Sequence, residues 1–179
     1  MSFPKEFVKI ASLVLLYPDL ESVLISYAEL AIDISVDDAA RLLYRMRSEA
    51  DRLNIADAIL HQYFKRVGLQ GPYAQFLGAI RHCKAIRNQY AHAVWDMRDE
   101  YLAFASLDEP ARTKEGTTYV PFAPIDLPTL EKQWDFFEYT DKVSRYLLKE
   151  AWFREDRRRR HHAILPKALP RPNLNSHRD

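Results

Sequence analysis

Residues 71–99 read GPYAQFLGAIRHCKAIRNQYAHAVWDMRD. Apolar residues recur along this stretch at helical spacing, namely Phe76, Ile80, Cys83, Tyr90, Val94 and Met97. The period predicts one face of a long helix that begins at Gly71-Pro72 and ends at about Asp99. The one gap in this stripe holds Arg87, and a guanidinium on an apolar face is costly unless it has partners or reaches a cleft or an interface. Arg87 is therefore the first candidate functional residue.

Four more helices are expected before this stretch. They span about residues 2–17, 21–32, 35–53 and 55–67. Pro18 should end the first of them, because proline has no N–H and clashes with the preceding turn of a helix. Ser35, which two aspartates follow closely, has the pattern of a helix N-cap. Gly68 has the pattern of a helix stop.

The pattern of the sequence changes after about Asp99. Residues 101–107 alternate, a turn-rich stretch follows, and residues 117–122 are β-branched and aromatic. We therefore expect a two-stranded β-hairpin over about residues 101–122. A last long helix is expected over about residues 129–153.

The predicted fold is mainly α: a helical bundle in a single domain, residues 1–153, with a small β-hairpin insertion between the last two long helices. Residues 154–179 are charged and contain prolines, so we expect a basic, flexible C-terminal tail there. Eight Lys/Arg against three acids give this tail a charge of +5, which leaves −4 for residues 1–153 out of the net +1. General attraction to phosphate should therefore come from the tail or from a local patch.

Composition excludes several classes of protein. With only four glycines, the chain has no Gly-rich phosphate loop of the nucleotide-binding kind. The single cysteine, Cys83, excludes an intramolecular disulfide framework and fits a reducing compartment. The apolar run Ile10–Tyr17 is too short to span a bilayer, which takes about 20 residues. We expect a cytoplasmic protein that does not contact a membrane.

Two further sets of residues are of types that could form sites. One is a basic run in the tail: Arg157, Arg158, Arg159 and Arg160. This run could bind RNA phosphates in a salt-sensitive way, or could serve only as a solvated tail. The other set is His61 and His82, whose spacings to Cys83 and His92 match no pattern of metal ligands. We expect neither a metal nor a cofactor.

The segment Arg87-Asn88-Gln89-Tyr90-Ala91-His92, followed three residues later by Trp95, resembles the signature of the HEPN superfamily. Many bacterial members read RNxxAHG with a tryptophan close behind, then a short β-hairpin and another helix. The Arg, Asn, Ala and His of that signature are in place here, whereas Ala93 stands where Gly is common. The resemblance covers roughly residues 35–153 in the order of elements and about ten residues in the motif.

The resemblance implies a helical domain that forms a homodimer and brings two copies of the motif helix to one cleft. In catalytic members that cleft cuts RNA without a metal. His92 would then act as general acid or base, Arg87 would stabilise charge on the phosphoryl group, and Asn88 would orient the pair. Histidine and arginine suit these roles, because histidine titrates near neutrality and guanidinium binds phosphate.

Geometry adds a condition to this hypothesis. Five residues of a straight helix turn the chain so that Arg87 and His92 lie about 140° apart, so a site that uses both needs a bend or a second copy of the helix. The leading interpretation is a metal-independent endoribonuclease of toxin or defence type, with RNA as substrate and an antitoxin as a further partner. Two alternatives stay open: a non-catalytic binding or regulatory module on the same fold, and an unrelated helical adaptor protein.

Overall fold

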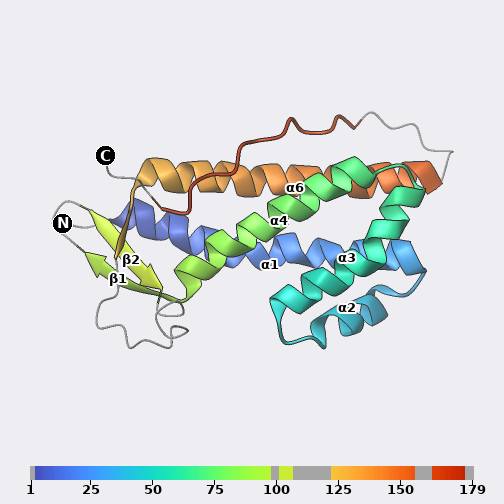
Figure 1. Cartoon of the computed structure of the whole chain (residues 1–179), viewed down its shortest axis with the longest axis horizontal. Coiled ribbons are helices and arrows are strands. Elements are labelled where there is room, and N and C mark those ends of the chain that lie inside the picture. The colour runs from blue at the N-terminus through green and yellow to red at the C-terminus, as the bar shows by residue number, and fades with distance from the viewer. Residues whose placement is uncertain (1–2, 98–100, 107–121, 156–162, 176–179) are drawn as a thin grey trace, which may run out of the picture. The chain divides into compact units, whose positions relative to one another are not determined.

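The computed structural model describes residues 3–97, 101–106, 122–155 and 163–175, and these residues are mainly helical. The helices are α1 (Pro4–Ile32), α2 (Val36–Tyr44), α3 (Glu49–Arg66), α4 (Gln70–Ala91) and α6 (Leu127–Glu155). A small antiparallel sheet lies between α4 and α6 in the chain (Figure 1). Its strands are β1 (Ala93–Met97), β2 (Leu102–Ser106) and β3 (Ala123–Ile125), in the order β1-β2-β3. The prediction of a mainly α fold with a small β insertion is confirmed.

Helix α1 continues through Pro18, so the predicted division into helices 2–17 and 21–32 is wrong. Proline removes one hydrogen bond from a helix and leaves one carbonyl of the preceding turn without its donor. Pro18 is exposed, so water can bond that carbonyl, while Tyr17 and Leu20 on either side of it are buried. Burial of these neighbours keeps the helix continuous where the local preference is to end it.

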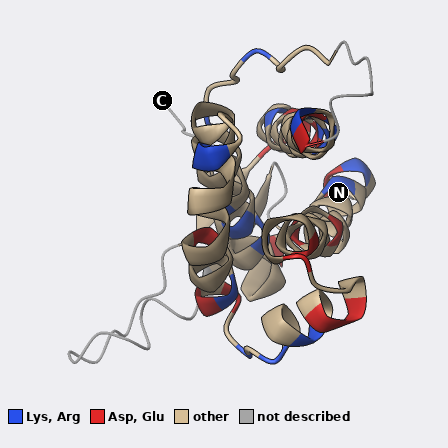
Figure 2. Cartoon of the chain, turned by 90° about the vertical axis from the view of Figure 1, so that its right-hand side faces the viewer, with Lys and Arg blue, Asp and Glu red and all other residues tan. Residues whose placement is uncertain are grey.

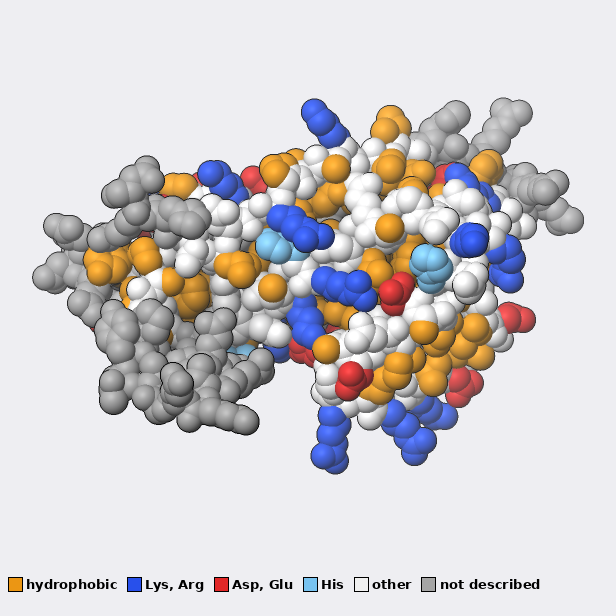
Figure 3. All heavy atoms as spheres, viewed as in Figure 1, with side chains coloured by type: hydrophobic (Ala, Val, Ile, Leu, Met, Phe, Trp, Pro, Cys, Tyr) orange, Lys and Arg blue, Asp and Glu red, His pale blue; other side chains and the backbone are white. Residues whose placement is uncertain are grey.

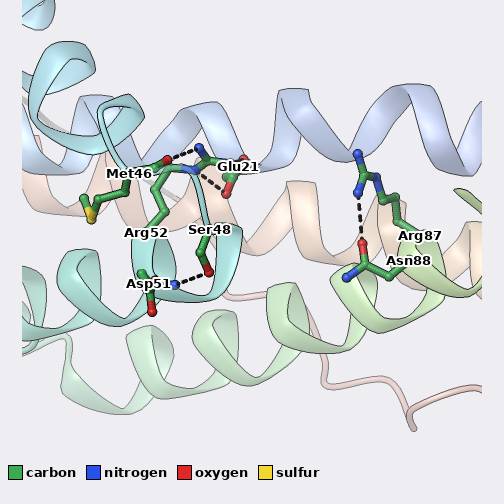
Figure 4. A network of polar contacts seen from close by, with 7 residues as sticks. All are labelled: Glu21, Met46, Ser48, Asp51, Arg52, Arg87 and Asn88. Carbon is green, nitrogen blue, oxygen red and sulfur yellow. Dashed lines mark hydrogen bonds and ion pairs between the residues drawn. The ribbon is translucent and has the colours of Figure 1, made fainter. Parts of the chain in front are cut away.

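The break between α2 and α3 falls at residues 45–48, so the predicted helix over residues 35–53 is also wrong. Ser35 does cap α2, since its Oγ accepts a hydrogen bond from the backbone N–H of Asp38 at 3.1 Å. A second serine, Ser48, caps α3 in the same way through the N–H of Asp51 at 3.3 Å (Figure 4). This second cap is a sequence signal for the earlier break.

Gly68 ends α3 as predicted, with a φ of +71° that side-chain-bearing residues rarely adopt. Arg154 donates through Nη1 to the carbonyls of Val67 at 2.7 Å and Gly68 at 2.8 Å. The arginine thus bonds two carbonyls at the carboxyl end of α3, where the last turn leaves carbonyls without helical donors.

Helix α4 ends at Ala91 and not at about Asp99, and the residues that follow form β1. Strand β1 pairs with β2 in a register that sets Trp95 opposite Phe104. Strand β2 matches the first strand expected over 101–107, but its described partners are β1 and β3. The second expected strand, residues 117–122, lies outside the described residues except for Phe122, which precedes β3.

The chain divides into two units, which we describe separately. Unit 1 consists of Met1–Tyr17, Arg81–Glu138 and Leu169–Asp179, and unit 2 consists of Pro18–Ile80 and Tyr139–Ala168. The core of unit 2 is aromatic: Tyr27 meets the rings of Phe64 and Phe76 edge-on, and its hydroxyl donates to the carbonyl of Ser144 at 2.8 Å. The sheet and the candidate motif belong to unit 1.

Candidate functional site

Arg87 is half-buried on α4, and its guanidinium is directed at α1 (Figure 4). The guanidinium carbon lies 5.9 Å from the centroid of the Tyr17 ring. Nη1 donates to Oδ1 of Asn88 at 2.9 Å, and Nε is buried. The gap in the apolar stripe at position 87 is covered by the neighbouring residue Ile86, which is 0% exposed. Arg87 therefore lies beside the apolar stripe and points its charge at α1.

His92 is exposed and is the first residue after α4. Its backbone N–H donates to the carbonyl of Asn88 at 3.3 Å, one turn earlier. The chain leaves the helix at the position where the HEPN-like signature has Gly and this chain has Ala93, the first residue of β1. Within one copy, Arg87 and Asn88 meet through their side chains, while the His92 side chain faces solvent.

Aromatic packing fixes the end of α4 against the sheet. The ring of Tyr90 stacks on Trp95 at 5.8 Å and meets Phe104 edge-on at 5.4 Å. Phe7 of α1 meets the Trp95 ring edge-on, with 6.0 Å between ring centroids. Burial raises the pKa of Tyr90, and its hydroxyl donates to Oε1 of Gln133 at 2.7 Å. His92 is therefore held between a fixed helix end and a fixed strand.

The C-terminal segment Leu169–Asn175 lies against α4 and α6 of unit 1, a contact that sequence reasoning missed. Residues 163–175 of the tail have neither helix nor strand, as expected for an extended chain, whereas Arg154 and Glu155 still belong to α6. Its backbone carbonyls nevertheless accept hydrogen bonds from His82, Gln89 and Gln133. The four candidate RNA-binding arginines, residues 157–160, lie outside the described residues.

Both signs of charge are spread over the helices (Figure 2). Apolar side chains reach the surface between the basic ones on the face shown in Figure 3. A shallow groove of about 440 Å³ in unit 1 is lined by Pro4, Lys5, Val8, Lys9, Leu127 and Glu131. Lys9 lies 4.6 Å from the centre of the Trp134 ring.

Within the described residues, no group of three or more His, Cys, Asp or Glu could hold a metal ion. No helix among them is long and apolar enough to cross a membrane.

In comparisons with known proteins, no protein-family model, no curated protein and no solved structure matches the chain. The resemblance of residues 87–92 to the HEPN signature therefore rests on the motif and on the order of the elements around it.

Proposed function

We propose that this protein is a HEPN-like, metal-independent endoribonuclease of toxin or defence type, with Arg87, Asn88 and His92 in a cleft between two copies of the chain. The observation that supports the proposal best is that the three motif residues lie close together at one helix end. Asn88 holds the guanidinium of Arg87 through one hydrogen bond at 2.9 Å, and His92 stands exposed one turn later.

The chemistry needs little beyond these groups. A 2′-oxygen attacks the neighbouring phosphorus, the bond to the 5′-oxygen breaks, and the products end in a 2′,3′-cyclic phosphate and a 5′-hydroxyl. His92 takes the proton from the 2′-hydroxyl or delivers one to the leaving oxygen. Arg87 stabilises the charge on the phosphoryl oxygens, because a guanidinium presents a planar fork of N–H donors to phosphate.

The surface next to His92 suits a second copy. Among the described strands, β1 lies at an edge of the sheet, and edge strands readily pair with another chain. Val94 is 42% exposed and Met97 is 65% exposed on this strand. An apolar edge directly after His92 would let two motif ends approach each other in a symmetric dimer.

RNA cleavage in EDTA tests the proposal. We expect wild-type protein to cut RNA, and His92→Ala and Arg87→Ala to lose at least a hundredfold in rate, because each removes a group that acts in the transition state. All three proteins must first be shown to be folded and equally dimeric, by circular dichroism and light scattering. A 2′,3′-cyclic phosphate on the product identifies the mechanism, whereas equal cleavage by the two variants would show that a contaminant is responsible.

A non-catalytic binding or regulatory module on the same fold is the second candidate. It is favoured by the direction of Arg87, whose guanidinium faces α1 and whose Nε is buried. Under this function Arg87 locks α4 onto α1, so Arg87→Ala lowers the melting temperature while His92→Ala does not. Intact RNA in every lane, across several classes of RNA, together with that pattern of stability, would support the binding module over the ribonuclease.

A further inference from the structure

The segment Leu169–Asn175 reads LPRPNLN and lies against α4 and α6 in unit 1. We call the polar surface that contacts it the groove; it is formed by three side chains of these helices, His82, Gln89 and Gln133. Nε2 of His82 lies 2.9 Å from the carbonyl of Pro172. The Gln89 amide donates to the carbonyl of Leu174 at 2.7 Å, and the Gln133 amide donates to the carbonyl of Asn173 at 2.8 Å. Three consecutive backbone carbonyls are thus bound by three side chains.

The groove is built for this contact. Gln133 is 0% exposed, and its Oε1 accepts the hydroxyl of Tyr90 at 2.7 Å, which turns its Nε2 towards the segment. The His82 ring is held edge-on against Phe136, with 5.3 Å between ring centroids. Both donors are therefore oriented by contacts that do not involve the segment.

The chemistry of the groove selects an extended, proline-containing peptide. Proline has no N–H, and a polyproline-type chain makes no internal hydrogen bonds, so its carbonyls remain available. A ligand that pairs as a β-strand would need both hydrogen-bond donors and acceptors from the groove. In the contacts here, the side chains of the groove donate and the backbone carbonyls of the segment accept. Proline-rich segments are recognised in this way because they are already extended before they bind.

We propose that His82, Gln89 and Gln133 form an exchangeable binding site for extended peptides of the pattern Leu-Pro-x-Pro-Asn-Leu, and that residues 169–175 are its resident ligand. Exchange is favoured by the exposure of the segment, since Leu169 is 43% exposed and Leu174 is 40% exposed. The proposal of a peptide site does not depend on the proposed catalytic function.

Trypsin cleavage after Lys167 reports on release of the segment in the full-length chain, because Lys167 is exposed and precedes the bound residues. We expect slow cleavage in wild type and at least tenfold faster cleavage in Gln133→Glu, which keeps the acceptor for Tyr90 and loses the amide donor. Gln62→Glu makes the same change at an exposed position of α3. Trypsin should cleave this control variant after Lys167 at the wild-type rate. Gln89→Ala should show an intermediate rate, which covers the case in which Gln133→Glu does not fold.

A synthetic peptide of residues 169–175 tests exchange. A tethered ligand has an effective concentration on the order of millimolar, so the peptide must be added at that level to speed cleavage of wild type. A fluorescent copy should bind the full-length double variant Pro170→Gly, Pro172→Gly at least tenfold more tightly than wild type. The fluorescent peptide should not bind a triple variant that combines Gln133→Glu with the two proline substitutions. Fast cleavage of Gln133→Glu, together with no binding of the peptide to wild type or to the double proline variant, would mean that the segment is a fixed strap and would overturn the proposal. Unchanged cleavage in all the groove variants would overturn it as well.

Discussion

The ion pair of Glu21 and Arg52 has little access to water. Two hydrogen bonds join them, from Nε to Oε1 at 2.9 Å and from Nη2 to Oε2 at 3.1 Å (Figure 4). Nη1 of Arg52 also donates to the carbonyl of Met46 at 3.2 Å, in the turn between α2 and α3. Because its side chain is only 11% exposed, Arg52 would be left with a poorly solvated charge if its partner were removed.

We therefore expect Glu21→Ala to lower the free energy of unfolding by about 3–5 kcal/mol, the usual cost of breaking a buried pair. Urea denaturation of the full chain measures it. The matched control is Asp141→Ala, which breaks the exposed pair with Arg145 at 2.8 Å and should cost under about 1 kcal/mol. Equal effects of the two substitutions would contradict the assignment of the Glu21 pair as buried. Replacing Glu21 and Arg52 together by leucines should recover much of the loss.

His82 gives the protein a dependence on pH. Burial lowers the pKa of His82 below its ordinary value of 6.5, Arg171 acts in the same direction, and the bond to the Pro172 carbonyl opposes them. The unfolded chain therefore binds this proton more tightly than the folded chain. The resulting stability is complete above about pH 6.5 and is lost as the pH falls through the folded pKa.

The melting temperature of wild type should therefore fall more steeply between pH 7 and pH 5 than that of His82→Gln. Glutamine keeps a donor for the Pro172 carbonyl but does not titrate. His61→Gln, at an exposed position of α3, serves as the control and should keep the wild-type slope. If the slope were the same with and without His82, the group responsible would lie elsewhere.

At the scale of elements, the junction of α3 and α4 depends on Gly68. A Cβ added there would meet Nη1 of Arg154 at 2.8 Å, and the φ of +71° disfavours any side chain. The positive φ alone costs about 1–2 kcal/mol, so Gly68→Ala should lower the free energy of unfolding by at least that amount. Thermal or urea denaturation checks it.

Gly71 is the matched control for this substitution. It lies in the first turn of α4, and a Cβ there would meet nothing within 4 Å. Alanine is favoured over glycine in a helix by roughly 0.5–1 kcal/mol, so Gly71→Ala should leave the stability unchanged or raise it. Destabilisation by Gly71→Ala comparable to that by Gly68→Ala would contradict the role given to the positive φ.

At the scale of the whole molecule, the proposed ribonuclease site requires two chains. If Arg87 of one copy acts with His92 of the other, a mixture of Arg87→Ala and His92→Ala proteins forms some dimers with one intact pair. Refolding the two variants together should then restore part of the cleavage that each lacks alone. No recovery, with mixed dimers demonstrated by mass spectrometry, would show that both residues act from the same chain or that both copies of one of them are needed.

Much of the fold follows from local signals in the sequence. The periodicity of apolar residues predicted helices, and Ser35 and Gly68 marked ends that the structure confirms. These signals work because a cap or a positive φ depends on a few neighbouring residues. The motif Arg87 to His92 was also visible as a pattern, although its activity stays a prediction.

Contacts between distant residues decided the rest. Residues 93–97 continue an apolar helical period, yet they form β1 because pairing with β2 and packing of Trp95 on Phe104 outweigh the local pattern. Pro18 stays inside α1 because the nearby Tyr17 and Leu20 are buried. The sequence by itself determined a mainly helical chain with a candidate motif on its central helix. Only the tertiary structure decided where that helix ends, where Arg87 points and that residues 169–175 dock, because these depend on partners far away in the chain.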